Sequence, residues 1–174
     1  MFKPMMTAGL LGLSLFAATI SCAQSFALPQ HGVLHLEVPA GWQAKLQPPP
    51  EKFPPTIRLS SESALLLITP LWDPNGGKLD LNDAKIRQAV EEFGARMLPA
   101  AAETTLNISK IQGQFIKGYY ATFTDKAPKP GGFKYATTGA VALNDLLVSA
   151  TYLSNTRDMT AFAAILGSAS ETHE

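Results

Sequence analysis

The sequence predicts an α+β fold, an antiparallel sheet of about seven to eight strands with a helix on each face. Strand-like runs, either alternating or continuously apolar, fill most of the chain, and turns of a few Gly, Asn, Asp or Pro residues join them. Connections this short favour antiparallel neighbours. Several runs are apolar at successive positions, so we expect both faces of the sheet to be covered, one helix on each.

The first strands are expected on either side of a tight turn. Residues 33–38 place Leu34, Leu36 and Val38 on one face, which is the pattern of a half-buried strand. Residues 43–46 are expected to return antiparallel beside them. By the same criteria, further strands are expected at 56–61, 64–71, 104–111, 114–125, 133–143 and 146–154.

Two apolar stripes at helical spacing predict the helices. The first consists of Ile86, Val90, Phe93 and Met97. Asp80 or Asn82 is expected to cap this helix, and Pro99 ends it. A final helix is expected to open after Asn155 and Asp158. Its buried side would consist of Phe162, Ile165, Leu166 and Ala169.

A single α+β domain at residues 33–169 is expected to hold all these elements. A flexible segment at 24–32 would precede it, and a frayed tail at 170–174 would follow it. A chain of 174 residues is long enough for one domain with its own core, without a metal or a disulfide.

The first 23 residues have the features of a secretory signal peptide. Lys3 supplies the positive start, residues 5–20 are uncharged and largely apolar, and small residues follow at 21–23. The apolar run is shorter than the ~20 residues that cross a bilayer. The mature protein is therefore expected to be exported and not to span a membrane.

Two fates are open for Cys22, the only cysteine of the chain. Cleavage before Gln24 gives a thiol-free protein that is periplasmic or secreted. Alternatively, residues 18–22 match a loose bacterial lipobox, although Thr19 stands where Leu is usual. Cys22 would then be lipidated, and the protein would be an outer-membrane lipoprotein.

The opening of the expected domain resembles a known family. The strand at 33–38 runs into Pro39, Gly41 and Trp42, a Pro-x-Gly-Trp turn. This opening, and the order of strands, one helix, hairpins and a terminal helix, is similar to the PsbP-like and DcrB-like α/β/α sandwich family of exported bacterial proteins. The resemblance covers nearly the whole mature chain and implies a non-enzymatic accessory or binding module. It implies no catalytic residues, and members bind unrelated partners, so it names no partner.

Charge and motifs exclude several classes of function. The chain has 14 Lys+Arg against 14 Asp+Glu, so no nucleic-acid partner is expected. It contains no dinucleotide fingerprint, Walker loop, Gly-x-Ser-x-Gly elbow or His-Glu-x-x-His motif. We therefore expect no catalytic residues, no cofactor and no metal ligands.

The histidines give no metal site by their spacing. His31 and His35 are four residues apart at the start of a strand, where about 13 Å separates them, too far for one ion. His173 lies in the predicted tail, where we expect nothing to hold it.

A basic loop is the candidate partner-binding surface. Lys126, Lys129 and Lys134 with Phe133 form a short finger between two strands. Such a loop suits anionic lipid or an acidic partner. The simpler explanation is a solvated turn whose lysines protect a sheet edge.

These observations favour an exported, non-catalytic binding or accessory module of the bacterial cell envelope. We expect a monomer whose partner is an unidentified envelope protein or small ligand. One alternative is a small periplasmic hydrolase whose site assembles from distant residues such as Asp125, Asp145 and a histidine. Another is an envelope lipoprotein with a structural or stress role, attached to the membrane only through a lipid on Cys22.

Overall fold

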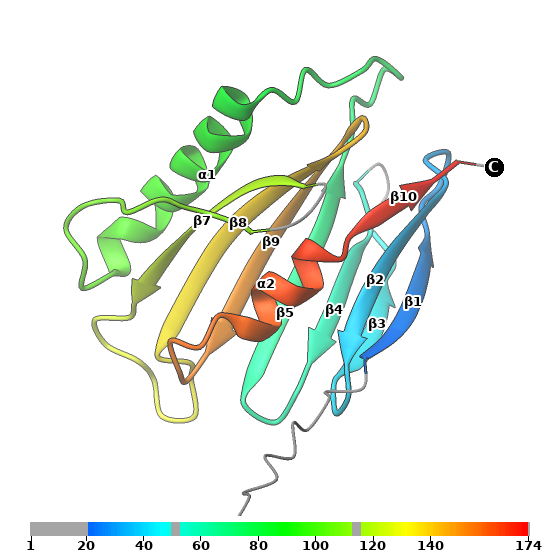
Figure 1. Cartoon of the computed structure of the whole chain (residues 1–174). Helices are drawn as coiled ribbons and strands as arrows, with labels where there is room; N and C mark the ends of the chain where they lie inside the picture. The colour runs from blue at the N-terminus through cyan, green and yellow to red at the C-terminus, as the bar shows by residue number, and fades with distance from the viewer. Residues whose placement is uncertain (1–20, 50–52, 113–115, 174) are drawn as a thin grey trace, which may run out of the picture.

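The computed structural model describes residues 21–49, 53–112 and 116–173. Within them the chain forms two antiparallel sheets and two α-helices (Figure 1). The predicted α+β class, the antiparallel sheet and the helix on each of its faces are confirmed. A second sheet of three strands is an addition that the sequence patterns did not predict. Residues 1–20, which carry most of the expected signal peptide, lie outside the described residues.

The larger sheet has seven strands in the order β3-β4-β5-β9-β8-β7-β6, and every neighbouring pair is antiparallel. β5 and β9 are distant in sequence but adjacent in the sheet, with Leu67 opposite Thr151. Their pairing joins the meander β3–β5 to the meander β7–β9. The strands are β3 (Gln43–Gln47), β4 (Thr56–Ser60), β5 (Ala64–Leu71), β6 (Ser109–Lys110), β7 (Lys117–Thr124), β8 (Tyr135–Leu143) and β9 (Leu146–Ser154).

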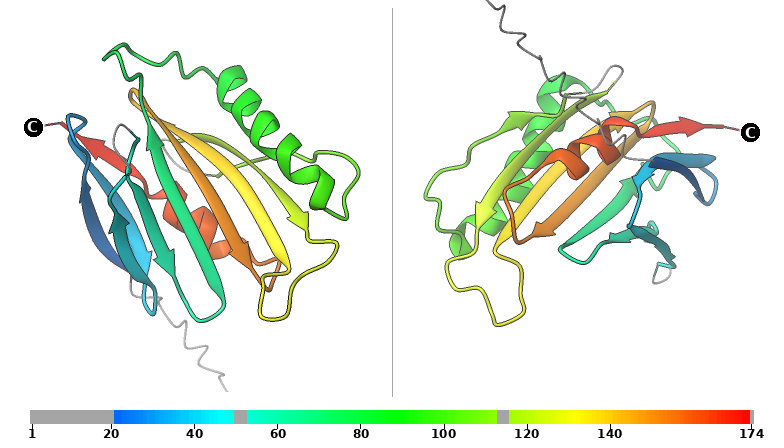
Figure 2. Two further views of the ribbon diagram at one scale, coloured as in Figure 1. Left: turned by 180° about the vertical axis from the view of Figure 1, so that it is seen from behind. Right: turned by 60° about the horizontal axis from the view of Figure 1, so that its bottom comes forward.

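The smaller sheet packs over one face of the larger sheet (Figure 2). It has β2 in the middle, flanked by the first and the last of the described strands in the order β1-β2-β10. The predicted alternation in β2 is confirmed, since Leu34, Leu36 and Val38 are buried. The strands are β1 (Ser21–Ala27), β2 (Val33–Pro39) and β10 (Ser170–Thr172).

The two helices lie on opposite faces of the larger sheet (Figure 2). α1 (Asp83–Met97) covers β7 and β8 and continues into a short 3-10 turn, η1 (Leu98–Ala100). The side chain of Asn82 caps α1 by accepting a hydrogen bond from the backbone N–H of Lys85 at 3.0 Å. α2 (Thr160–Gly167) lies beside β2 and completes the layer that the smaller sheet begins.

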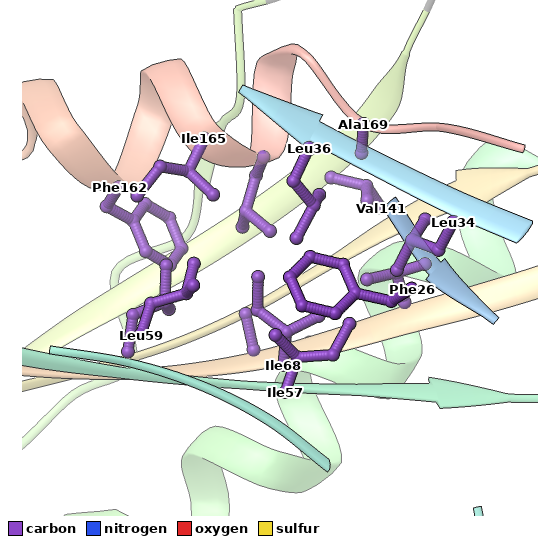
Figure 3. Packing of buried hydrophobic residues seen from close by; sticks show 14 of the residues in the cluster. Phe26, Leu34, Leu36, Ile57, Leu59, Ile68, Val141, Phe162, Ile165 and Ala169 are labelled. Atoms are coloured by element: carbon purple, nitrogen blue, oxygen red, sulfur yellow. The ribbon is translucent and has the colours of Figure 1, made fainter. Parts of the chain in front are cut away.

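The main core fills the space between the larger sheet and this second layer (Figure 3). Phe162 of α2 is fully buried, and the rings of Tyr120 and Tyr152 lie 5.8 and 5.7 Å from it. Gly139 makes room for Phe162, because a Cβ at that position would lie 2.8 Å from Cζ of the ring. These aromatic side chains therefore belong to the core.

A smaller core lies between α1 and the opposite face of the sheet. Ile86 and Val90, two members of the predicted stripe, are fully buried in it. Gly94 allows α1 to approach β7 closely, because a Cβ there would lie 2.5 Å from Leu106 Cδ1 and 3.2 Å from Phe123 Cζ. The sequence thus positions α1 by both its apolar stripe and this glycine.

Two segments predicted to be flexible are strands. The expected flexible segment at 24–32 contains most of β1, and the expected tail at 170–174 contains β10. Both strands pair with β2, Ser25 opposite His35 on one side and Ser170 opposite His35 on the other. The prediction was wrong because these short strands lack apolar periodicity. They form because pairing satisfies the backbone polar groups on both edges of β2.

Two predicted strand arrangements also need correction. β3 pairs with β4, with Lys45 opposite Arg58, and not with β2. The turn at 39–42 instead carries the chain from the smaller sheet to the larger one. Of the strand predicted at 104–111, only β6 forms. The preceding residues use Leu106 and Ile108 to cover the smaller core without regular strand pairing.

Truncation of Phe162 tests the main core. Phe162→Ala removes a fully buried ring, so we expect the free energy of unfolding to fall by about 3–5 kcal/mol. Phe53→Ala is the matched control, because Phe53 is 67% exposed, and we expect it to change stability by less than about 0.5 kcal/mol. Urea unfolding followed by circular dichroism measures both. Equal losses in the two variants would contradict this account of the core.

Candidate functional site

Three ionisable side chains converge where the β8–β9 turn meets β10. Asp145, Glu171 and His173 each offer one ligand atom, and these atoms all lie within 4.8 Å of one another. We call this group the carboxylate–imidazole cluster. Figure 1 shows the β8–β9 turn and the end of β10 at the same end of the molecule.

Strand geometry places two members of the cluster. In β10, Glu171 lies opposite Leu34 of β2, whose side chain is buried in the main core. Because side chains alternate along a strand, Glu171 points to the same inner side, and His173 two residues later follows it. Thr172 points the other way and forms a hydrogen bond with His35 at 2.8 Å.

A tight turn places the third member. Asn144 and Asp145 form the two-residue connection between β8 and β9, and Asn144 has a φ of 45°. Asn tolerates this left-handed conformation, which two-residue hairpin turns favour. The Asn144 side chain donates a hydrogen bond from Nδ2 to Glu171 Oε2 at 3.1 Å. This contact fixes the orientation of the Glu171 carboxylate.

The cluster leaves two carboxylate oxygens without a hydrogen bond. His173 Nε2 lies 3.5 Å from Glu171 Oε1 and 4.0 Å from Asp145 Oδ1. Both oxygens are buried, and within the described part of the chain neither accepts a hydrogen bond. The Glu171 side chain is completely buried, with 0% of its surface exposed. A buried carboxylate oxygen without a partner is costly, so this arrangement favours a proton or a cation between the oxygens.

The same arrangement shifts the ionisation of Glu171. Burial raises the pKa of its carboxyl above the ordinary value, and the charge of Asp145 raises it further. The hydrogen bond from Asn144 and the nearby imidazoles of His173 and His31 offset only part of this rise. Two ionised carboxylates at this distance repel each other, so both are stable in the ionised form only when a positive charge lies beside them.

An open cavity adjoins the cluster. Its volume is about 550 Å³. It is lined by Lys78, Leu79, Asn144, Asp145 and His173. The cluster is therefore accessible from solvent on one side and anchored to the protein core on the other. This combination suits the binding of a small charged ligand.

The predicted basic loop lies at the other end of the molecule. Lys126, Lys129 and Lys134 are exposed and Phe133 is half-buried. Lys126 donates a hydrogen bond to the Pro99 carbonyl at 3.3 Å. The loop remains a candidate partner surface, although the ammonium group of Lys126 already forms this hydrogen bond within the protein.

The residues named for a hydrolase do not form one site. Asp125 donates its backbone N–H to the Lys134 carbonyl before β8 begins, whereas Asp145 follows the end of that strand. The nine residues of β8 span about 30 Å, so the two aspartates lie far apart. Asp145 instead meets a histidine, His173.

The other two histidines make different contacts, although His31 is near enough to Glu171 for its charge to lower the pKa of that carboxyl. His31 stacks on Trp72 with ring centroids 4.4 Å apart. His35 forms hydrogen bonds with Ser25 and Thr172, both at 2.8 Å. The expectation that nothing holds His173 was wrong, because β10 carries it to Asp145 and Glu171.

Cys22 lies inside β1, opposite Val38, and is exposed. The expected signal boundary after residue 23 therefore falls within a strand. Phe26 and Leu28, the buried residues of this segment, lie beyond both expected processing points. Either mature N-terminus would retain these core contacts.

Sequence reasoning missed the cluster because its members are joined only by tertiary structure. Asp145 comes from a turn, and its partners come from a segment expected to be frayed. One signal was present, since Glu171 and His173 have the two-residue spacing that places side chains on one face of a strand. That signal has meaning only once β10 is recognised as a strand.

A solved structure from Bacteroides thetaiotaomicron VPI-5482, determined at 1.50 Å resolution, is similar to this chain. The TM-score is 0.52 at 12% sequence identity, over 81% of this chain and 46% of that one. The likeness therefore supports the sandwich fold alone, and this chain spans less than half the length of its neighbour. No family model and no curated protein matches the sequence.

Neutralising Glu171 should change the pH dependence of stability. Because the folded pKa lies above the unfolded value, stability is lost as pH rises through the folded pKa. In EDTA, we expect Glu171→Gln to reduce this loss between pH 4 and pH 8. The control is Glu62→Gln at an exposed position, which should leave the wild-type dependence intact. Urea unfolding at several pH values measures both, and identical profiles for wild type and Glu171→Gln would be inconsistent with the buried charge.

Proposed function

We propose that this protein is an exported binding module of the bacterial cell envelope, and that the carboxylate–imidazole cluster is its ligand-binding site. The observation that carries the proposal is the buried side chain of Glu171, whose Oε1 faces Asp145 and His173 and accepts no hydrogen bond from the described residues. A preformed polar site beside an open cavity is typical of ligand binding.

The composition of the site disfavours a serine or cysteine hydrolase. The described residues that line the cavity carry carboxylate, imidazole, amide, amine and apolar groups, and none carries a hydroxyl or a thiol. A hydrolase with a serine, threonine or cysteine nucleophile would need such a group beside its base. The accessory or binding role implied by the resemblance to PsbP-like domains agrees with this proposal.

Export is supported by the N-terminal sequence, with Lys3 followed by the apolar residues 5–20. Among the described residues, no helix is both long and apolar enough to cross a bilayer. The position of the first strand is compatible with processing, because the exposed residues Ser21, Cys22 and Ala23 contribute pairing to β1 but no buried side chain.

Attachment by a lipid is a second candidate, favoured by the exposure of Cys22. A lipid on this side chain would not have to enter the main core. The start of β1, which contains Cys22, lies at the same end of the molecule as the β7–β8 loop (Figure 1). Lysines near an anionic surface add about 1 kcal/mol each to membrane binding.

The N-terminus of the mature protein distinguishes the two forms. Expressed with its own signal in a Gram-negative host, the protein should have a free amine at Gln24 and an intact mass without lipid. Cys22→Ser should then change neither its processing nor its release by osmotic shock. A blocked, diacylated Cys22 would instead establish the lipoprotein, and Cys22→Ser would detach that form from membranes.

Activity and ligand content test the binding role. Against a panel of ester, phosphate, peptide and glycoside substrates, we expect no turnover above a buffer control. Native mass spectrometry of protein purified without chelator should show a bound species that Glu171→Gln loses and Asp125→Asn retains. Turnover that disappears in Asp145→Asn would favour the hydrolase instead. No bound species in any preparation would contradict the binding role.

A further inference from the structure

We infer that Asp145, Glu171 and His173 bind a divalent transition-metal ion of the zinc class. The ligand atoms would be one oxygen of each carboxylate and one imidazole nitrogen. This inference rests on the proposed binding role of the same site and names the class of its ligand.

The distances fit a common metal geometry. The bonds of zinc to imidazole nitrogen and carboxylate oxygen are about 2.0–2.2 Å, so neighbouring ligands of a tetrahedral ion lie about 3.3–3.5 Å apart. His173 Nε2 lies 3.5 Å from Glu171 Oε1 and 4.0 Å from Asp145 Oδ1. All three atoms lie within 4.8 Å of one another, so an ion among them would need the side chains to move together by about 1 Å.

The burial of the carboxylates is a second, independent observation. Glu171 Oε1 and Asp145 Oδ1 are shielded from solvent and accept no hydrogen bond from the described residues. Coordination would give both oxygens a partner and neutralise their mutual repulsion. An ion pair between the carboxylates and a protonated His173 is the competing explanation. However, Nε2 of His173 lies farther from both oxygens than a good hydrogen bond allows, so the ion pair gives neither oxygen a hydrogen bond.

The surroundings resemble the support that metal ligands require. Asn144 Nδ2 holds Glu171 Oε2 at 3.1 Å, which leaves Oε1 directed toward the other two ligands. The side of the cluster that faces the cavity, near Lys78, can accept a water molecule or an external ligand as the fourth partner. Three protein ligands with one open position, which a water molecule or a substrate fills, are the arrangement of catalytic zinc sites, so the turnover assays apply to the zinc-loaded protein as well.

The donor set separates zinc-class ions from calcium. Calcium takes six to eight oxygen ligands, whereas imidazole nitrogen is preferred by zinc, copper, nickel and iron. One imidazole with two carboxylates therefore favours zinc over calcium or magnesium.

Binding would also strengthen the link between the two sheets that the Asn144–Glu171 hydrogen bond makes. Glu171 and His173 belong to the smaller sheet and its continuation, and Asp145 belongs to the turn between two strands of the larger one. A bound ion should therefore slow amide hydrogen exchange in β10, which without it is held by pairing with β2 and by the hydrogen bond from Asn144 to Glu171.

Calorimetry of the untagged, mature protein tests the site directly. After treatment with EDTA and removal of the chelator, ZnCl₂ at pH 7.5 should bind at one site per chain, and CaCl₂ should not compete. We expect Asp145→Asn, Glu171→Gln and His173→Gln each to weaken zinc binding by at least about tenfold. Asp125→Asn is the matched carboxylate control and should bind zinc as wild type does.

Two further measurements keep the result interpretable. Glu171→Gln changes a buried side chain and could unfold the protein. His173 is half-exposed, so His173→Gln should retain the circular dichroism spectrum of the wild type and still report on zinc binding. Hydrogen exchange in β10 should slow with zinc in the wild type and not in His173→Gln.

Zinc binding that survives all three substitutions would identify adventitious surface binding and overturn the inference. Absence of zinc binding would overturn it as well. The binding role would then stand only if native mass spectrometry still shows another species that Glu171→Gln loses. If neither zinc binding nor any other bound species is detected, both the metal site and the binding role are contradicted.

Discussion

The apolar face of the larger sheet that α2 packs against is wider than α2 can cover. The smaller sheet is needed to bury the remainder of that face. Seven strands span about 30 Å at about 4.8 Å each, whereas the eight residues of α2 extend only about 12 Å. Ile57, Leu59 and Ile68 would remain exposed without a second cover. The smaller sheet supplies that cover through Leu34 and Leu36 of β2.

Covering the core in this way creates a new requirement. A lone strand over a sheet has two edges of unpaired backbone groups, and β1 and β10 pair with one edge each. The pairing of Glu171 with Leu34 then points a carboxylate inward at the margin of the core. The candidate site is thus a consequence of how β2 is completed.

The sequence predicts the parts whose side chains repeat with a clear period. The stripe of Ile86 and Val90 and the alternation of β2 are examples, since burial itself produces the pattern. β10 has no such pattern, because three mostly polar residues form a strand only when β2 is already in place. The meeting of Asp145 with His173 depends in turn on β10, so no reading of local sequence could place the two residues together.

The strand order also gives the molecule two chemically distinct poles. The start of β1, which contains Cys22, and the lysine-rich β7–β8 loop lie at one pole. The β8–β9 turn and the end of β10, which carry the carboxylate–imidazole cluster, lie at the other (Figure 1). The nine-residue strand β8 runs between them and sets their separation at about 30 Å. If the first pole were held to a bilayer, the domain would act as a short rigid stalk. Its cluster would then face the open compartment, beyond the Debye length of the charged lipid surface.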